Sequence, residues 1–342
     1  MNISQKLQLS WLVVIAGFMV SCSTPSHQVT PASAPARVWP PAPDEPRITY
    51  VESLRGPHDI GQKPSAFRSL ANWVTGNTGE NLNLRKPFAV ALDEATNLCI
   101  ADTEANLVCY VDFHRKKWLR FAGVGKTNFS CPVAVACGRG IIYVADSVLG
   151  KVFAFHTDGK PVFEISAPLN RPVGLAIAGG SLYVVDAQAH AVFVFGLDGK
   201  FQFQFGRRGT GPGEFNFPTC IAADDRGHLV VSDTMNSRVQ VFDLRGNFLS
   251  QFGSNGDTSG HFARPKGVAV DSTGRIYVVD AVFDNFQIFD GDGRLLLNVG
   301  ESGVAPGEFA LPNGIAISPD GRIFVADAFN NRVQIFKYIG QP

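Results

Sequence analysis

The chain has 342 residues, enough for one large domain or two of ordinary size. Hydrophobic residues make up 45% of it and charged residues only 18%, a balance that excludes a globally disordered chain and allows a sizeable core. Lysine plus arginine and aspartate plus glutamate number 30 each, so the chain as a whole lacks the excess positive charge typical of nucleic-acid binding.

The first 21 residues predict a secretory signal peptide. Lys6 gives a weakly basic start, and the apolar run from Leu9 is too short to cross a bilayer comfortably. The sequence Met-Val-Ser-Cys, which ends at Cys22, resembles a bacterial lipobox, and this implies that Cys22 is lipidated. Ser23 after the cysteine implies sorting to the outer membrane, facing the periplasm. An ordinary signal peptide cut nearby and an uncleaved anchor are the alternatives.

Residues 22–46 predict an extended tether, because proline, serine and alanine dominate and no apolar period is present. Such a tether would lift a folded domain off the membrane. The folded domain is expected over residues 47–342, starting with a strand over 47–54.

An insert over residues 56–85 contains a predicted helix between Pro64 and Gly76. Its apolar side chains recur at helical spacing along one stripe, with a tryptophan beside it, so that the residues expected to dock the helix are Phe67, Leu70, Trp73 and Val74. We expect this stripe to pack on the folded domain. A lid over a site and a docking surface for a partner are the alternatives.

The rest of the chain consists of six repeats, marked by two residue types in register at intervals of 40 to 47 residues. A proline opens each unit, at Pro87, Pro132, Pro172, Pro218, Pro265 and Pro312. An aspartate recurs in phase, at Asp102, Asp146, Asp186, Asp233, Asp280 and Asp327. We therefore expect units that begin near residues 86, 132, 172, 218, 265 and 312.

Each unit predicts four short strands separated by turns, as residues 265–300 illustrate. This grammar is typical of propeller blades, and the apolar second and third strands fit burial between two neighbouring blades. The sixth unit has three strands, and residues 47–54 can supply the fourth and so close the ring. The prediction is an all-β, six-bladed propeller with one short inserted helix.

The repeats resemble the NHL family. The pattern is P-x-G-[IV]-A-[IV], then D-G-R-[IL]-[YF]-V-[AV]-D, then N-x-R-V-Q-[IV]-F, and it is clearest at 218–242, 265–289 and 312–336. The resemblance implies six four-stranded blades. The first three units depart from it, because Leu107, Lys151 and Ala191 stand where later units have Arg238 and Arg332.

The repeated aspartates and the two arginines are interpreted as architecture. Asp233–Arg238 and Asp327–Arg332 have the same spacing, and an aspartate at this point can accept hydrogen bonds from loop N–H groups while it holds a basic side chain. A catalytic centre needs one constellation, whereas this feature occurs in every blade.

No cofactor or metal site is predicted. Of the seven histidines, only His190 and His261 are expected on the face that carries the connections between blades. Propellers that act as zinc lyases use several converging histidines, and catalytic zinc generally needs three protein ligands. The cysteines show no disulfide framework, because the expected hairpin register places Ile100 opposite Cys109, so that Cys99 and Cys109 face opposite ways.

The residues that bracket the blade-opening prolines should surround the mouth of a central channel. They include more cations than the overall balance predicts, and the binding residues expected there are Arg85, Lys86, Phe129, Arg171, Phe217, Arg264, Lys266 and Asn313. Such a basic mouth with aromatic edges suits an acidic peptide, a carboxylate or an anionic glycan. Ordinary solvated loop charges are the alternative.

These features favour a non-enzymatic, lipid-anchored module of the bacterial envelope that binds a protein or an anionic peptide or glycan. The alternative is a metal-dependent lyase or lactonase with its site in the channel. Nucleic acid is not an expected partner, given the export signal and the balanced charge.

Overall fold

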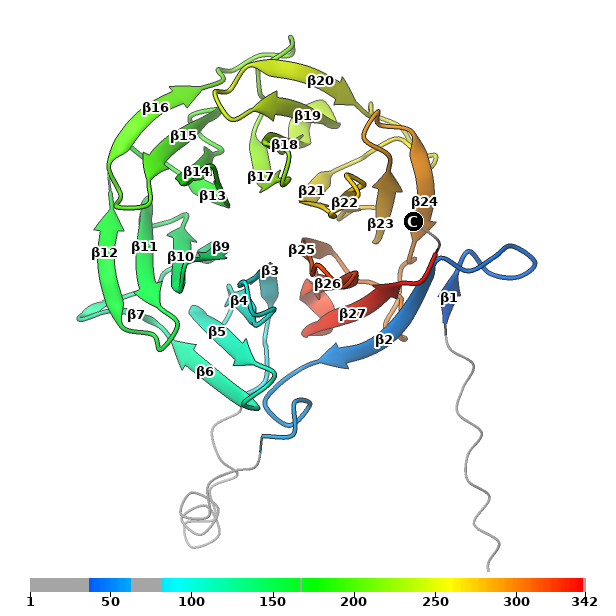
Figure 1. The fold of residues 1–342 in the computed structure, drawn as a ribbon, viewed down its shortest axis with the longest axis horizontal. Coiled ribbons are helices and arrows are strands. Elements are labelled where there is room, and N and C mark those ends of the chain that lie inside the picture. The colour runs from blue at the N-terminus through cyan, green and yellow to red at the C-terminus, as the bar shows by residue number, and fades with distance from the viewer. Residues whose placement is uncertain (1–36, 63–81, 167, 341–342) are drawn as a thin grey trace, which may run out of the picture. The chain divides into compact units, whose positions relative to one another are not determined.

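The computed structural model describes residues 37–62, 82–166 and 168–340, and these form six antiparallel sheets around a ring (Figure 1). The predicted all-β six-bladed propeller is confirmed. Cys22 and the four docking residues Phe67, Leu70, Trp73 and Val74 lie outside the described residues. Within the described ranges no helix is long and apolar enough to span a membrane, and the two helices are single 3₁₀ turns, η1 (Thr234–Asn236) and η2 (Ala328–Asn330).

Blades 1 to 5 each have four strands that run outward from the centre in chain order, whereas the N-terminal β2 is the fourth strand of blade 6 (Figure 1). Blade 1 consists of β3 (Pro87–Leu92), β4 (Leu98–Asp102), β5 (Leu107–Asp112) and β6 (Lys117–Phe121). Blade 2 consists of β9 (Pro132–Gly138), β10 (Ile141–Asp146), β11 (Lys151–His156) and β12 (Pro161–Ile165). Blade 3 consists of β13 (Pro172–Ala178), β14 (Ser181–Asp186), β15 (Ala191–Gly196) and β16 (Phe201–Phe205). Blades 4 and 5 are β17 (Pro218–Ala223), β18 (His228–Asp233), β19 (Arg238–Asp243) and β20 (Phe248–Phe252); and β21 (Pro265–Val270), β22 (Ile276–Asp280), β23 (Asn285–Phe289) and β24 (Leu295–Val299). Blade 6 is β25 (Pro312–Ile317), β26 (Arg322–Asp327), β27 (Arg332–Tyr338) and the N-terminal β2 (Ile48–Leu54), and a small hairpin of β7 (Gly123–Val124) and β8 (Thr127–Asn128) follows blade 1.

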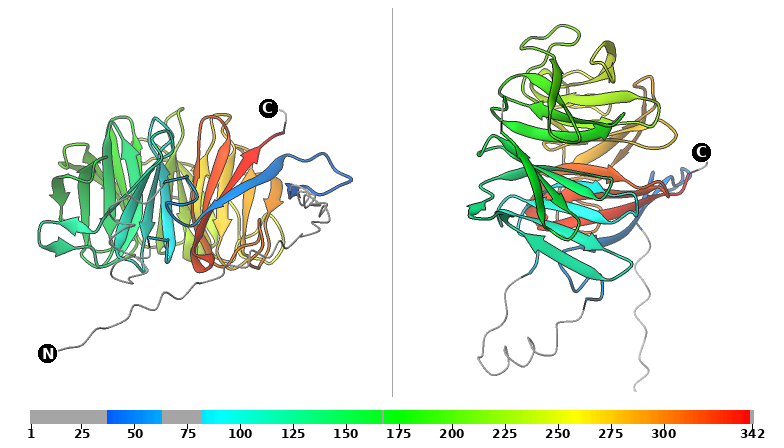
Figure 2. Two further views of the ribbon diagram at one scale, coloured as in Figure 1. Left: turned by 90° about the horizontal axis from the view of Figure 1, so that it is seen from below. Right: turned by 60° about the vertical axis from the view of Figure 1, so that its left-hand side comes forward.

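The repeat markers coincide with strand ends. Every blade-opening proline is the first residue of a first strand, and every repeated aspartate is the last residue of a second strand. The alternating strand directions therefore bring both markers to the same face of the ring, which also carries the connections between blades (Figure 2). We call this face the mouth face. The glycine of the P-x-G motif allows close approach here, since a Cβ on Gly267 would lie 2.3 Å from the Asn313 carbonyl oxygen of the next blade.

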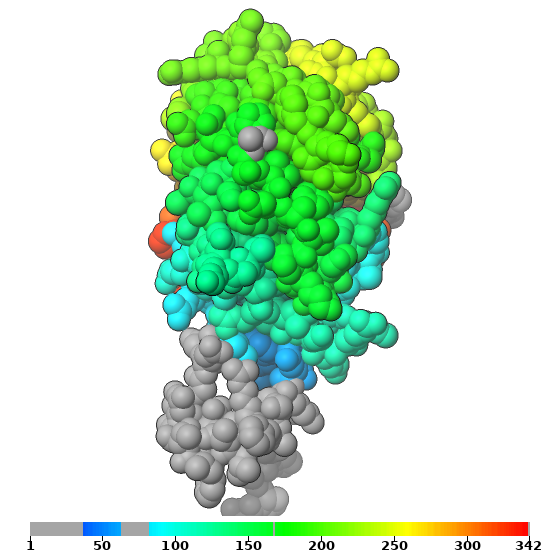
Figure 3. All heavy atoms as spheres, turned by 90° about the vertical axis from the view of Figure 1, so that its left-hand side faces the viewer, coloured from blue at the N-terminus to red at the C-terminus, as the bar shows by residue number. Residues whose placement is uncertain are grey.

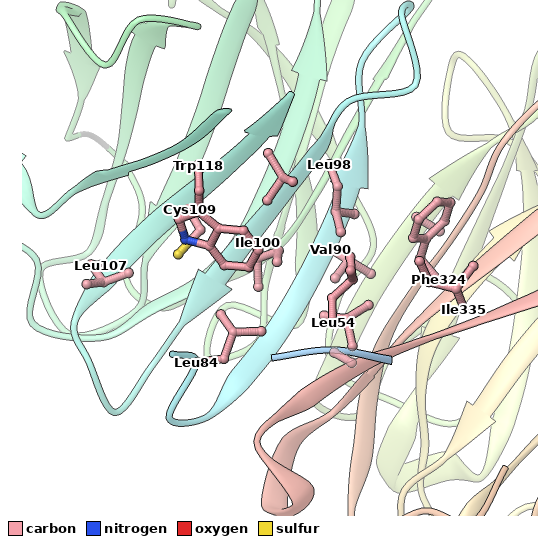
Figure 4. Close-up of a cluster of buried hydrophobic side chains, with 14 residues drawn as sticks. Leu54, Leu84, Val90, Leu98, Ile100, Leu107, Cys109, Trp118, Phe324 and Ile335 are labelled. Atoms are coloured by element: carbon pink, nitrogen blue, oxygen red, sulfur yellow. The ribbon is translucent and has the colours of Figure 1, made fainter. Parts of the chain in front are cut away.

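The ring is closed by the predicted N-terminal strand. β2 pairs antiparallel with β27, from Ile48 opposite Tyr338 to Leu54 opposite Val333, with a bulge at Tyr50. Ile48 and Leu54 are buried on opposite sides of the closure. Figure 4 shows Leu54 among the apolar side chains that join blade 6 to blade 1.

The chain before β2 also belongs to the propeller, which corrects the predicted end of the tether at residue 46. β1 (Val38–Trp39) adds a fifth strand outside β2, and Trp39 packs edge-on against Phe336 with ring centroids 5.6 Å apart. The Arg37 guanidinium forms ion pairs with Glu301 and Glu308, the latter at 3.1 Å. The abundance of proline predicts a tether over residues 37–46, but the contacts of Arg37 and Trp39 hold this segment against blades 5 and 6.

Candidate functional site

A central channel of about 1000 Å³ runs between the six first strands, β3, β9, β13, β17, β21 and β25. Its mouth is formed by the residues just before and just after the blade-opening prolines. The residues directly before the prolines that line it are Lys86, Cys131, Arg171, Phe217 and Arg264, and those directly after are Phe88, Val133, Val173, Thr219, Lys266 and Asn313. The structure thus brings together six of the eight predicted mouth residues.

The repeated aspartates hold the backbone of the mouth. In blade 3, Asp186 Oδ2 accepts hydrogen bonds from the N–H groups of Asn170 at 2.6 Å and Arg171 at 2.9 Å. In blade 5, Asp280 accepts in the same way from Ala263 and Arg264. These carboxylates are fully buried, and the bonds satisfy them while they fix where each mouth side chain starts.

Blades 4 and 6 differ because an arginine takes one carboxylate oxygen. Arg238 Nε lies 2.9 Å from Asp233 Oδ2, and Arg332 Nε lies 2.7 Å from Asp327 Oδ2. The guanidinium groups also donate to loop carbonyls, such as that of Glu308 at 2.8 Å from Arg332 Nη2. Each aspartate then binds only one of the two backbone N–H groups before the proline.

In blades 4 and 6 the residue directly before the proline, whose N–H group does not bind the aspartate, has a left-handed backbone conformation. Phe217 and Leu311 both have φ of 48°, which is a steric outlier for side chains of this size. Their N–H groups are taken up by the preceding blade: Phe217 donates to His190 Nδ1 at 3.2 Å, and Leu311 donates to Asp284 Oδ1 at 2.7 Å. Both side chains are exposed on the mouth face.

Two predicted mouth residues lie elsewhere. Phe129 is buried between blades and packs against Phe155 with ring centroids 5.8 Å apart. It occupies the third position before its proline, where every blade buries an apolar side chain, and these are Leu84, Phe129, Leu169, Phe215, Phe262 and Phe309. Arg85 stands two residues before its proline, and its exposed side chain is not part of the channel lining. Closeness to the proline in sequence is therefore not a sufficient criterion. Whether a side chain points into the channel depends on how many residues it stands before the proline.

Histidine and cysteine side chains provide no metal site in the described part of the chain. No group of three or more histidine, cysteine, aspartate or glutamate side chains there could hold a metal ion. His190 accepts the Phe217 N–H, and His261 lies 3.1 Å from the Thr258 hydroxyl. The register places Ile100 opposite Cys109 as expected, and all five described cysteines are free thiols.

Comparison with known proteins agrees with this geometry. Residues 262–289 and 309–336 match the NHL repeat family, and residues 166–230 match a family described as a 6-bladed beta-propeller. The chain is an NHL-repeat β-propeller. No curated protein matches its sequence significantly.

Several solved structures share the fold of this NHL propeller. A gluconolactonase from Xanthomonas campestris is 15% identical with a TM-score of 0.57, and the match covers 85% of this chain and 98% of the other. Virginiamycin B lyase from Staphylococcus aureus is 13% identical with a TM-score of 0.54, over 75% of this chain and 96% of the other. A protein of unknown function from Bacteroides thetaiotaomicron is 17% identical with a TM-score of 0.59, over 75% and 70%. At these identities the likeness shows the fold alone.

The mouth of the NHL propeller is electropositive. Four of the lining side chains are cationic, Lys86, Arg171, Arg264 and Lys266, against one carboxylate, Glu104. Sequence reasoning missed Glu104 and also Met235, which lie two residues after a repeated aspartate and reach the channel from the loop between second and third strands. Their fixed distance from that aspartate is a signal that could have identified them.

Lys266 is the central cation of the mouth. Its ammonium group has no hydrogen-bond or ion-pair partner among the described side chains, whereas Lys86 lies 4.5 Å from the centre of the Phe329 ring. Burial lowers the pKa of Lys266, and the nearby positive charges of Arg264 and Arg171 lower it further. Three cations therefore share one small region, and none of them forms an ion pair with a described carboxylate, which is the arrangement that an anionic ligand would stabilise.

Proposed function

We propose that this NHL propeller is a binding module of the bacterial envelope, anchored through Cys22, that holds an anionic group of a protein, peptide or glycan partner at the mouth of its channel and does not catalyse a reaction. The observation that carries the proposal is the uncompensated positive charge of Lys266, Arg264 and Arg171. The anchor is supported by the lipobox-like sequence before Cys22.

The chemistry of the mouth favours binding over turnover. The charged side chains that line the channel are four cations, Lys86, Arg171, Arg264 and Lys266, and a single carboxylate, Glu104. Guanidinium and ammonium groups form charge-assisted hydrogen bonds with carboxylates and sulfates. The described lining residues include no histidine and no second carboxylate that could work with Glu104 in proton transfer.

The test is crosslinking of the intact protein in its native envelope, followed by identification of the captured partner. The double variant Arg264→Ala, Lys266→Ala should capture that partner at least tenfold less, because hydrogen bonds to charged groups contribute about 1.5–3 kcal/mol each. The matched control is Arg245→Ala, Arg294→Ala, which removes two exposed cations from blades 4 and 5 at turns on the face opposite the mouth. Equal capture by both variants would contradict the proposal. A stoichiometric metal on the purified protein, together with hydrolysis of lactones or cleavage of lyase substrates, would support an enzyme instead.

Binding of an anionic partner is expected to weaken as the pH rises toward the ordinary titration range of lysine. The lowered pKa of Lys266 means that this side chain loses its charge earlier than an exposed lysine does. Below that pKa the ammonium attracts the anion, and above it the attraction is lost. The affinity for a pentaglutamate peptide, measured from about pH 7 to about pH 10, should fall in the wild type. It should stay nearly constant in Lys266→Arg, whose guanidinium remains charged, and a parallel fall in both would contradict the assignment to Lys266.

A further inference from the structure

We infer that the anionic group bound at Lys266 carries an apolar group, which enters the channel behind this side chain, so that the ligand class is a carboxylate joined to an aliphatic or aromatic group. The inference rests on the proposed function and narrows it. Two sources share this chemistry, the free C-terminus of a protein that ends in an apolar residue and an alkanoic acid.

The first observation is the division of the channel into two zones. All polar and charged lining side chains lie at the mouth, beside the prolines or just after the repeated aspartates. Deeper in the channel the lining residues are only glycine, alanine, valine, leucine, isoleucine and cysteine. Lys266 stands at the boundary, directly before Gly267 and Val268 of the apolar zone. A ligand with charge alone would use only the mouth, whereas an apolar group can remove the deeper wall from water.

The second observation is the concentration of exposed apolar side chains around the mouth. The position two residues after the repeated aspartate carries one in four of the six blades, and these are Val148, Met235, Val282 and Phe329. Val304, Phe217 and Leu311 add three more on the same face. The other exposed large apolar residues in the described ranges are Ile339 and five residues on the outer strands of the blades. Figure 3 shows the outer edge of the ring on the side of β12 and β16. An exposed apolar patch around a cationic centre indicates a ligand with both characters.

The third observation is the strained backbone that presents two of these side chains. Phe217 and Leu311 keep φ of 48° although neither is glycine, and such outliers collect at ligand sites. Phe217 is held in place by edge-on packing against His190, with ring centroids 4.6 Å apart. The aromatic ring is therefore fixed at the mouth and lines the channel, where it can contact an apolar group close to the bound carboxylate.

The fourth observation is the rigid support of Lys266. Thr234 Oγ1 donates to the Pro265 carbonyl at 2.7 Å and lies 2.7 Å from Thr219 Oγ1. These bonds tie the first strand of blade 5 to blade 4 directly beside Lys266. The ammonium thus starts from a fixed backbone, and its position favours a short charged group over a diffuse polyanion.

The test uses the intact protein in nanodiscs of phosphatidylcholine and measures binding by calorimetry. The probes are straight-chain carboxylates from acetate to octanoate, and an apolar tetrapeptide that ends in leucine with either a free or an amidated C-terminus. Affinity should rise about fourfold for each added methylene until the channel is filled, since a buried methylene contributes about 0.8 kcal/mol. The free peptide should bind at least tenfold more tightly than the amide if the source is a protein C-terminus. Binding of octanoate without binding of the peptide would assign the site to alkanoic acids.

The variant Lys266→Met should lose at least tenfold in octanoate affinity, and Lys266→Arg should keep most of it. Arg294→Met, an exposed cation on the opposite face of blade 5, is the control and should change nothing. Thermal unfolding of each variant shows that the fold is intact. The inference is overturned if affinity does not depend on chain length, or if octanoate binds equally to Lys266→Met. Pentaglutamate distinguishes a failure of this inference from a failure of the proposed function. If pentaglutamate binds through Lys266 while the chain length of the carboxylate has no effect on affinity, the proposed function stands and only this inference fails.

Discussion

Replacing Arg332 by methionine is expected to lower the free energy of unfolding by about 3–5 kcal/mol, because the change leaves a buried carboxylate without its cation. Asp327 is fully buried and Arg332 is only 2% exposed. The guanidinium also donates to the carbonyl oxygens of Ala305 at 2.9 Å and Glu308 at 2.8 Å, which would lose these partners. Asp327 would keep only neutral donors, among them the Gln334 amide at 3.0 Å. Urea unfolding followed by circular dichroism measures the loss.

Two further variants show whether the buried pair is the cause. Arg294→Met removes an arginine whose side chain is 76% exposed, so stability should change by less than about 0.5 kcal/mol. The double variant Asp327→Asn, Arg332→Met removes both charges, and it should be more stable than the single arginine variant by about 1 kcal/mol or more. A single variant no less stable than the exposed control would show that the repeated pair does not support the blade.

Most of the fold could be predicted because the repeat fixes where the first strand of each blade starts and where the second strand ends. Proline cannot donate a ladder hydrogen bond, so it starts the first strand, and the buried aspartate ends the second strand where it caps the loop before the proline. Pro265 and Asp280 face each other in the sheet, as do Pro312 and Asp327. The structural role of the repeated proline and aspartate could therefore be deduced from the sequence.

The mouth was predicted less well because its side chains alternate in direction over very short loops. Position one before the proline lines the channel in blade 4, at Phe217, while position three, at Phe215, is buried in the core. A prediction by proximity thus admitted Phe129, which has the buried position. The number of residues between each side chain and the next proline distinguishes residues that line the channel from residues buried in the core, since the third position before the proline is apolar in all six units.

The strand β1 could not be predicted, because its support is distant in sequence. Val38 and Trp39 stand in a proline-rich stretch that carries no strand period. They pair with Thr49 and Ile48 on β2, and Trp39 packs against Phe336 near the C-terminus. The neighbouring Arg37 forms ion pairs with Glu301 and Glu308. Only the closed ring brings these residues together, so tertiary contacts decide the local structure here.

Removing the closing strand is expected to abolish the folded monomer. A chain that starts at Gly56 would lose Ile48 and Leu54 from the core, at about 1.5–3 kcal/mol each, and would leave the whole of β27 without its partner. It would also lose the hydrogen bond from Arg47 Nη2 to the Leu296 carbonyl at 2.9 Å, which links the closing segment to blade 5. These losses together approach the total stability of an ordinary domain, and the bare edge of β27 can pair with other chains.

Light scattering after size-exclusion chromatography distinguishes the outcomes of this truncation. A chain that starts at Ala36 keeps β1 and β2, so it should elute as the same species as the longer protein, whereas the chain from Gly56 should form larger, heterogeneous species. A synthetic peptide of residues 37–54 added during refolding should restore the former species, because it supplies the missing strand and the contacts of Arg37 and Trp39 with blades 5 and 6. A stable monomer from Gly56 without the peptide would mean that blade 6 needs only three strands, and that the pairing of β2 with β27 serves to hold the N-terminal segment rather than the ring.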